Sequence, residues 1–150
     1  MMPTLPKPDV RELVSNVELV GVKYLQISGQ AKPQGEESRS VDEDISSADV
    51  NFSVQESHGP AAIEVRFRVH VDHPQAQYDV ELATRYTSNV EYDLEQEVVR
   101  DFIEKVAVMA AFPYVREAIS SMAARLELEV PILGVLRQGE FSLGPADSSS

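Results

Sequence analysis

Three consecutive segments alternate apolar and polar residues, and this alternation constrains the fold more than any other feature of the chain. Apolar side chains occupy every second position across 50–54, 63–71 and 78–82, with polar or charged residues between them. A period of two predicts a strand with one buried face. The segments between the strands, 57–60 and 72–75, are short enough for hairpin turns. We therefore expect these segments to be neighbours in an antiparallel sheet.

A fourth strand is expected earlier, over about 17–28, although its alternation is less regular. The apolar phase set by Val17 and Leu19 shifts by one residue at Val20, next to Gly21, and shifts back at Leu25. A β-bulge produces such a shift, and glycine within a strand often marks one. The four strands together predict a four-stranded antiparallel meander sheet.

Helical periodicity follows the strands. Asp93 is a candidate N-cap, and apolar residues recur every three or four positions from Leu94 to Ala110. Pro113 has no backbone N–H, so it favours the start of a new helix over the interior of a long one. A second apolar stripe then continues to Leu126. Strands followed by two helices predict the α+β fold class.

The chain is expected to form one domain with two disordered tails. The tail at 1–9 is proline-rich, the tail at 138–150 is rich in serine, and the domain spans 10–137. Asp9 is a candidate cap for a single helical turn at 10–13. The polar segment 30–44 is expected to be a solvated connection.

Charge and composition exclude several classes of function. The net charge is −12 and there is no cysteine. The negative charge argues against a nucleic-acid partner, and the lack of cysteine excludes disulfides and zinc–thiolate sites. No segment has the length and apolarity of a membrane span, and the N-terminus has no signal core. We expect a cytoplasmic protein with no membrane insertion.

No group of polar residues predicts an active site. His70, Asp72 and His73 offer two imidazoles and a carboxylate, but a strand end and turn explain them more simply than a metal site. The acidic residues between 91 and 101 suit the N-terminal end of a helix, where negative charge is favourable. We find no nucleotide-binding or nucleophile motif. The expectation is a protein without catalytic, metal or cofactor-binding residues.

The supply of apolar and aromatic residues exceeds what the expected core requires. The 17–28 strand is apolar on both faces, and the first helical stripe is wide. Either these residues form a homo-oligomer interface, or part of the surface binds apolar segments of other chains. Both can hold at once.

The segment around Pro113 connects this pattern to a known family. It reads Phe112-Pro113-Tyr114-Val115-Arg116-Glu117-Ala118-Ile119-Ser120-Ser121-Met122. This resembles the signature of SecB, the bacterial protein-export chaperone: Phe-Pro-Tyr-Ala-Arg-Glu, a small residue, Ile, a small polar pair and an apolar residue. The order of strands and helices is similar to the SecB subunit over roughly 17–126.

The resemblance implies a homotetramer, a dimer of dimers, and an ATP-independent holdase that binds non-native polypeptides in apolar grooves. By the same resemblance, such a holdase is expected to serve either protein export or a toxin–antitoxin system, and in the second case its client is an antitoxin. The alternative is an interaction module dedicated to one protein partner. The candidate groove residues are Tyr24, Leu25, Phe52, Tyr78, Tyr86 and Phe102. The helix junction and the assembly are assigned to Phe112, Pro113, Tyr114, Arg116, Glu117, Ile119 and Met122.

The resemblance also bears on delivery to the translocase ATPase, which SecB contacts through acidic residues on its sheet. The candidate acidic docking face here is Asp79 and Glu81, whereas Gln26 and Gln30 stand where family acids are expected. Residues 134–137 replace the family's Pro-Val-Asn-Phe segment. The strand charges have a second explanation, since Arg66 and Arg68 face the acidic neighbours across strands and can form ion pairs with them.

Overall fold

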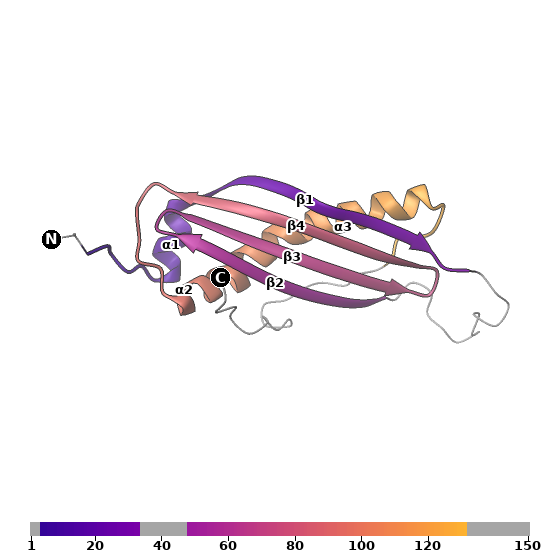
Figure 1. The fold of residues 1–150 in the computed structure, drawn as a ribbon, viewed down its shortest axis with the longest axis horizontal. Helices are drawn as coiled ribbons and strands as arrows, with labels where there is room; N and C mark the ends of the chain where they lie inside the picture. The colour runs from indigo at the N-terminus through magenta and orange to yellow at the C-terminus, as the bar shows by residue number, and fades with distance from the viewer. Residues whose placement is uncertain (1–3, 34–47, 132–150) are drawn as a thin grey trace.

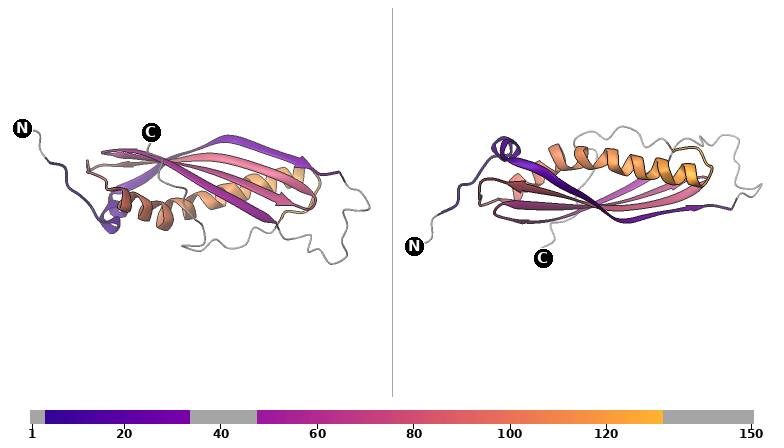
Figure 2. Two further views of the ribbon diagram at one scale, coloured as in Figure 1. Left: turned by 60° about the horizontal axis from the view of Figure 1, so that its bottom comes forward. Right: turned by 90° about the horizontal axis from the view of Figure 1, so that it is seen from above.

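The chain folds into a twisted antiparallel sheet with helices on one face (Figures 1 and 2). The computed structural model describes residues 4–33 and 48–131. Two layers are sufficient here because the sheet and the long helix bury their apolar surfaces against each other. The elements in chain order are α1 (Val10–Asn16), β1 (Val17–Ala31), β2 (Asp49–Gly59), β3 (Ala62–His73), β4 (Ala76–Ser88), α2 (Gln96–Phe102), a π-helical turn η2 (Ile103–Ala107) and α3 (Val108–Arg125).

The strand order is β1-β4-β3-β2, and all pairs are antiparallel. The four predicted strands and both hairpin turns are therefore confirmed, and β2, β3 and β4 form a meander. The prediction of a meander through all four strands was wrong for β1, which pairs with β4 instead of β2. Short turns force β2, β3 and β4 to be neighbours, but residues 32–48 separate β1 from β2 and impose no such pairing.

Both phase shifts predicted in β1 are bulges. The pairing with β4 skips one residue between Leu19 and Gly21 and another between Tyr24 and Gln26. The inserted residues are Val20 and Leu25, at the positions where the apolar alternation changes phase. Because each bulge adds one residue, β1 keeps its pairing with β4 while presenting apolar side chains in two phases.

The helical segment is not interrupted at Pro113, so the prediction of two helices joined there was wrong. The elements α2, η2 and α3 follow one another without a gap, and Pro113 lies inside α3. Its side chain is on the exposed face of the helix. There the carbonyl of Met109, which loses its usual partner, can be hydrated. The irregularity is instead the π-helical turn, which ends before α3 begins.

The start of the helical segment also differs from the prediction. The N-cap of α2 is Glu95, whereas Asp93 lies before the helix and donates its backbone N–H to the carbonyl of Pro6, 2.9 Å away. Lys7 lies within ion-pair distance of Asp93 and Glu95. The described part of the predicted 1–9 tail is therefore held against the start of α2. The predicted 138–150 tail and the end of the domain at 137 lie outside the described residues.

Asp9 caps α1, as predicted. Its Oδ1 accepts a hydrogen bond from the N–H of Glu12 at 2.8 Å, and the helix extends beyond the predicted turn to Asn16. Leu13 on α1 is 1% exposed and belongs to the same core as the sheet and α3.

The core lies between the helix layer and one face of β3 and β4. Alternate residues of β3 are 2% exposed or less, and β4 supplies a matching row. Tyr86 of β4 contacts Phe102 of α2 edge to face, with ring centroids 4.9 Å apart. Each buried aliphatic or aromatic side chain contributes roughly 1.5–3 kcal/mol. No helix within residues 4–33 and 48–131 is both long and apolar enough to cross a membrane.

Candidate functional site

Three of the predicted groove residues belong to the core. Tyr78 and Phe102 are fully buried and Tyr86 is 2% exposed. Their assignment to a client-binding groove is therefore corrected: in this chain they support the fold. Aromatic residues in an alternating pattern mark a buried face, and the sequence pattern alone does not show whether a helix covers that face.

Tyr24 connects the edge strand β1 to α3. Its hydroxyl donates to the backbone carbonyl of Tyr114 at 3.0 Å and lies 3.5 Å from Oε2 of Glu117. Burial and, after it, the nearby Glu117 carboxylate raise the pKa of Tyr24 above its ordinary value. The side chain is half-buried, so it is one wall of the contact between β1 and α3 and not a free surface residue.

Exposed apolar side chains concentrate along β1. We call this set the β1 apolar edge, and it consists of Leu19 (40% exposed), Val20 (51%), Leu25 (37%) and Ile27 (48%). Of these, only Leu25 is among the predicted groove residues. The signal for the other three is the two-phase apolar pattern of 17–28, which predicts a bulged strand that is apolar on both faces. Edge strands with this much exposed apolar surface are prone to pair with another chain.

The opposite edge of the sheet, β2, carries a smaller apolar row that alternates along the strand. Val50 is 38% exposed, and Phe52 and Val54 are partly buried against the core. The ring of Phe52 lies 5.6 Å from that of Phe67 on β3. Phe52 is thus the predicted groove residue whose position beside a sheet edge agrees best with a binding role.

The Phe112–Met122 motif forms part of α3 and presents two different faces. Phe112, Ile119 and Met122 lie in the buried face, with exposures of 9% or less. Tyr114 is 39% exposed, and the guanidinium of Arg116 lies 4.9 Å from the centre of the Phe112 ring. The motif therefore fixes α3 against the sheet rather than joining two helices.

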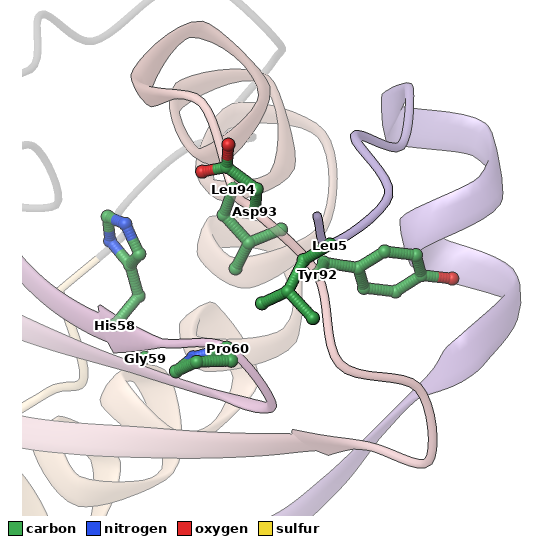
Figure 3. A pocket seen from close by; sticks show the side chains of 7 residues that line it. All are labelled: Leu5, His58, Gly59, Pro60, Tyr92, Asp93 and Leu94. Carbon is green, nitrogen blue, oxygen red and sulfur yellow. The ribbon is translucent and has the colours of Figure 1, made fainter. Parts of the chain in front are cut away.

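An open hollow lies at the end of the sheet where the β2–β3 turn meets the segment before α2 (Figure 3). Its volume is about 410 Å³. Apolar side chains of Leu5, Pro60 and Leu94 line it beside His58 and Asp93. The Tyr92 hydroxyl points away from the hollow and accepts a hydrogen bond from Nδ2 of Asn16 at 2.9 Å. A hollow with this lining can hold an apolar side chain of a bound peptide, and His58 and Asp93 can contact a polar group next to that side chain.

Cross-strand ion pairs occupy the face of the sheet that the helices leave uncovered, which we call the open face. Arg68 lies 3.5 Å from Glu81, Arg85 lies 3.9 Å from Glu64, and His70 contacts Asp79 at 2.8 Å. The predicted pairing of Arg68 with the acids of the next strand is confirmed. Asp79 and Glu81, the predicted acidic docking face, lie on this open face beside His70 and Arg68, with side chains 43% and 13% exposed, and their docking role stays a prediction.

Lys32 and Asp72 form a further pair beside the β3–β4 turn. The hydrogen bond from the Lys32 ammonium is the main reason why the pKa of Asp72 lies below its ordinary value. The neighbouring His73 is 2% exposed, and its Nδ1 accepts the backbone N–H of Gln75 at 3.1 Å. Within the described ranges, no three His, Asp or Glu residues are grouped closely enough to hold a metal ion.

Comparison with known proteins identifies the family, although no family model matches the chain. The chain is 34% identical over 137 residues to the SecB-like chaperone SmegB of Mycolicibacterium smegmatis, covering 90% of this chain and 86% of that protein. The chain belongs to the SecB-like chaperone family. This confirms the resemblance carried by the Phe112–Met122 motif.

A solved structure shows the same SecB-like fold. It is the Mycobacterium tuberculosis Rv1957 SecB-like chaperone in complex with a ChAD peptide from the Rv1956 HigA1 antitoxin. The TM-score is 0.68 at 18% identity, over 85% of this chain and 92% of that one. The agreement confirms the antiparallel sheet followed by a helix as the family's architecture.

Proposed function

We propose that this SecB-like protein is an ATP-independent holdase of a toxin–antitoxin system, and that it binds an apolar segment of an antitoxin in the cytoplasm. Membership of the family supports the chaperone role. A fold neighbour was solved with an antitoxin peptide, which supports the choice of client class. The role requires only apolar burial and backbone hydrogen bonds, so it needs no catalytic group or cofactor.

The observation that carries the proposal is exposed apolar surface on both edge strands of one sheet. The β1 apolar edge and the Val50 to Val54 row lie on opposite edges, so two binding events do not exclude each other. An edge strand offers unpaired backbone groups to an incoming segment, and alternate side chains give that segment apolar contacts. Low specificity is expected of such a surface.

We assign assembly to β1 and the client to β2. β1 is the longer edge strand and carries the larger set of exposed apolar side chains. A second copy of the chain that buries this edge would form a dimer, and dimers would pair into the proposed homotetramer. The β2 edge leads through His58 directly to the hollow lined by Leu5, Pro60 and Leu94. An extended client segment can therefore lie along β2 and place an apolar side chain in the hollow.

The decisive experiment measures client binding and assembly separately. Phe52→Ser and Leu94→Ser should weaken suppression of aggregation of a thermally denatured client, and should weaken binding of the antitoxin encoded nearest to this gene. Ile27→Lys should instead lower the native mass measured by light scattering. Tyr114→Ser, which changes an exposed aromatic residue on α3, away from both sheet edges, serves as the control. Wild-type protein that neither suppresses aggregation nor binds the antitoxin contradicts the proposal.

The same experiment separates the holdase from the alternative of a module dedicated to one partner. A holdase suppresses aggregation of unrelated clients at a stoichiometry set by its assembly. A dedicated module binds the antitoxin alone and leaves unrelated clients to aggregate. Delivery to the translocase ATPase is less favoured than either role, because Asp79 and Glu81 each lie beside a basic residue.

A further inference from the structure

Basic side chains gather at the centre of the open face, although the chain as a whole has a net charge of −12. We call this set the basic patch, and it consists of Lys23 on β1, Arg66 and Arg68 on β3, and Arg85 on β4. The strand register places them in three neighbouring rows, where a row is a set of residues paired across adjacent strands. In the middle row, Ala83 of β4 pairs with Lys23 on one side and with Arg66 on the other. Arg85 and Arg68 lie two residues away along their strands, in the rows on either side of this one.

The acidic side chains of these rows are less exposed to solvent than the basic side chains beside them. The side chain of Arg68 is 68% exposed, whereas its partner Glu81 is 13% exposed. Arg85 is 65% exposed against 40% for Glu64. The guanidinium groups of Arg68 and Arg85 are therefore more accessible to a partner than the carboxylates beside them.

Two members of the basic patch have no acidic partner among residues 4–33 and 48–131. Lys23 and Arg66 are both exposed, and neither forms an ion pair with a described residue. Their neighbours in the middle row are Gln55 and Ala83, which carry no charge. Arg66 also borders a shallow hollow that it shares with Ser53, Gln55, Arg68 and Glu81. Arginine in such a position can receive a carboxylate bidentately, and Ser53 and Gln55 can add hydrogen bonds.

We propose that the basic patch is a second docking surface, and that its occupant is an acidic polypeptide segment of another protein. Charge complementarity selects the occupant: two unpaired cations flanked by two exposed guanidinium groups match several carboxylates spaced along an extended chain. A nucleic acid is disfavoured, because the patch is small and the surrounding protein carries a strong negative charge. The patch lies on the open face of the sheet and is centred on β3 and β4, with Lys23 on β1 and the polar side chains of Ser53 and Gln55 on β2 at its margins.

The test measures binding of a fluorescein-labelled hexaglutamate peptide to the full chain by anisotropy at low ionic strength. Wild-type protein should bind it saturably, and added salt should weaken the binding. The double variant Arg66→Glu, Arg68→Glu should lose about tenfold in affinity, since both changes place repulsive charge at the site. The control Arg11→Glu, Arg100→Glu makes the same change in net charge on exposed helical residues and should bind nearly as wild type does.

Neutral variants keep the proposal testable if the charge-reversed protein fails to fold. Arg66→Gln and Lys23→Gln keep strand-compatible side chains of similar length and should each weaken hexaglutamate binding. Equal weakening in the helical control, no binding by wild type, or tighter binding of a single-stranded DNA hexamer through the same residues would each overturn the proposal. Aggregation suppression should be unchanged in all patch variants, so failure here is distinguishable from failure of the holdase role.

Discussion

Tyr24 on β1 donates its phenolic O–H to the backbone carbonyl of Tyr114 on α3, across 3.0 Å. The acceptor residue directly follows Pro113, and the donor lies immediately before the inserted residue of the second β1 bulge. One hydrogen bond thus connects the edge strand that carries most of the exposed apolar surface to the helix that carries the family motif. This contact holds β1 against the helix layer while the outer edge of β1 stays accessible.

Replacing Tyr24 by phenylalanine should lower the free energy of unfolding by about 1 kcal/mol, the usual net worth of such a hydrogen bond. Urea denaturation followed by circular dichroism measures the change. Tyr114→Phe is the matched control, because the acceptor is the backbone carbonyl and survives the loss of that hydroxyl. Equal destabilisation by the two variants would show that the Tyr24 hydrogen bond contributes nothing specific.

The Tyr24 contribution should also depend on pH in a defined direction. The folded protein raises the pKa of Tyr24 above the ordinary value of about 10, through burial and then Glu117. Its stabilising effect is therefore fully present below pH 10 and is lost as the pH rises through the folded pKa. The stability difference between wild type and Tyr24→Phe should be constant near neutral pH and shrink in alkaline solution. A difference that grows above pH 10 would contradict the shift.

The fold could be predicted from the sequence wherever a local pattern decides the outcome. Alternation gave the strands, short turns gave the β2–β4 hairpins, and the phase shifts at Gly21 and Leu25 gave the bulges. Pairing of β1 with β4 could not be predicted, because residues 32–48 form a long connection whose closure entropy depends only weakly on where the chain ends meet. The helix break predicted at Pro113 was wrong, because a helix can continue through a proline when the carbonyl that loses its partner lies on an exposed face and can be hydrated.

The candidate site was predicted less completely than the fold. Tyr78, Tyr86 and Phe102 carry the same aromatic signal as Phe52, but the packing of the helices against the sheet buries them and leaves Phe52 beside a sheet edge. Leu19, Val20 and Ile27 belong to the two-phase pattern of 17–28, which predicted a bulge and a surplus of apolar surface but did not show which individual residues are exposed. Exposure is a property of the tertiary arrangement, so residue type alone does not reveal it.

Pro113→Ala should raise the free energy of unfolding by about 1–3 kcal/mol, because proline inside a helix removes one backbone hydrogen bond. The alanine N–H can donate to the carbonyl of Met109. Pro113→Gly restores the same donor but adds backbone freedom to the unfolded chain, so it should stabilise by about 1 kcal/mol less than alanine. Destabilisation by Pro113→Ala in thermal melts would indicate that the proline ring is needed where it stands.

Gly29→Ala should destabilise the protein by about 1–3 kcal/mol through overpacking. A Cβ at this position would lie 3.1 Å from Sδ of Met122 and 3.1 Å from Cδ1 of Tyr78. Gly21→Ala on the same strand is the control, since a Cβ there meets nothing within 4 Å. Urea denaturation should separate the two variants. Equal effects would mean that strand propensity, and not the contact with Met122, decides the outcome.

Lys32→Met should destabilise the protein at neutral pH and have a progressively smaller effect in acid. The hydrogen bond from Lys32 lowers the pKa of Asp72. A carboxyl group with a lowered folded pKa stabilises the protein above its unfolded pKa, about 3.9, and this stabilisation is lost as the pH falls through the folded pKa. Denaturation curves between pH 7 and acid should therefore converge for wild type and Lys32→Met. Lys23→Met, which changes a lysine on β1 that forms no ion pair among the described residues, should show no such convergence. If the Lys32→Met deficit instead persisted undiminished in acid, the Asp72 carboxylate would not be its source.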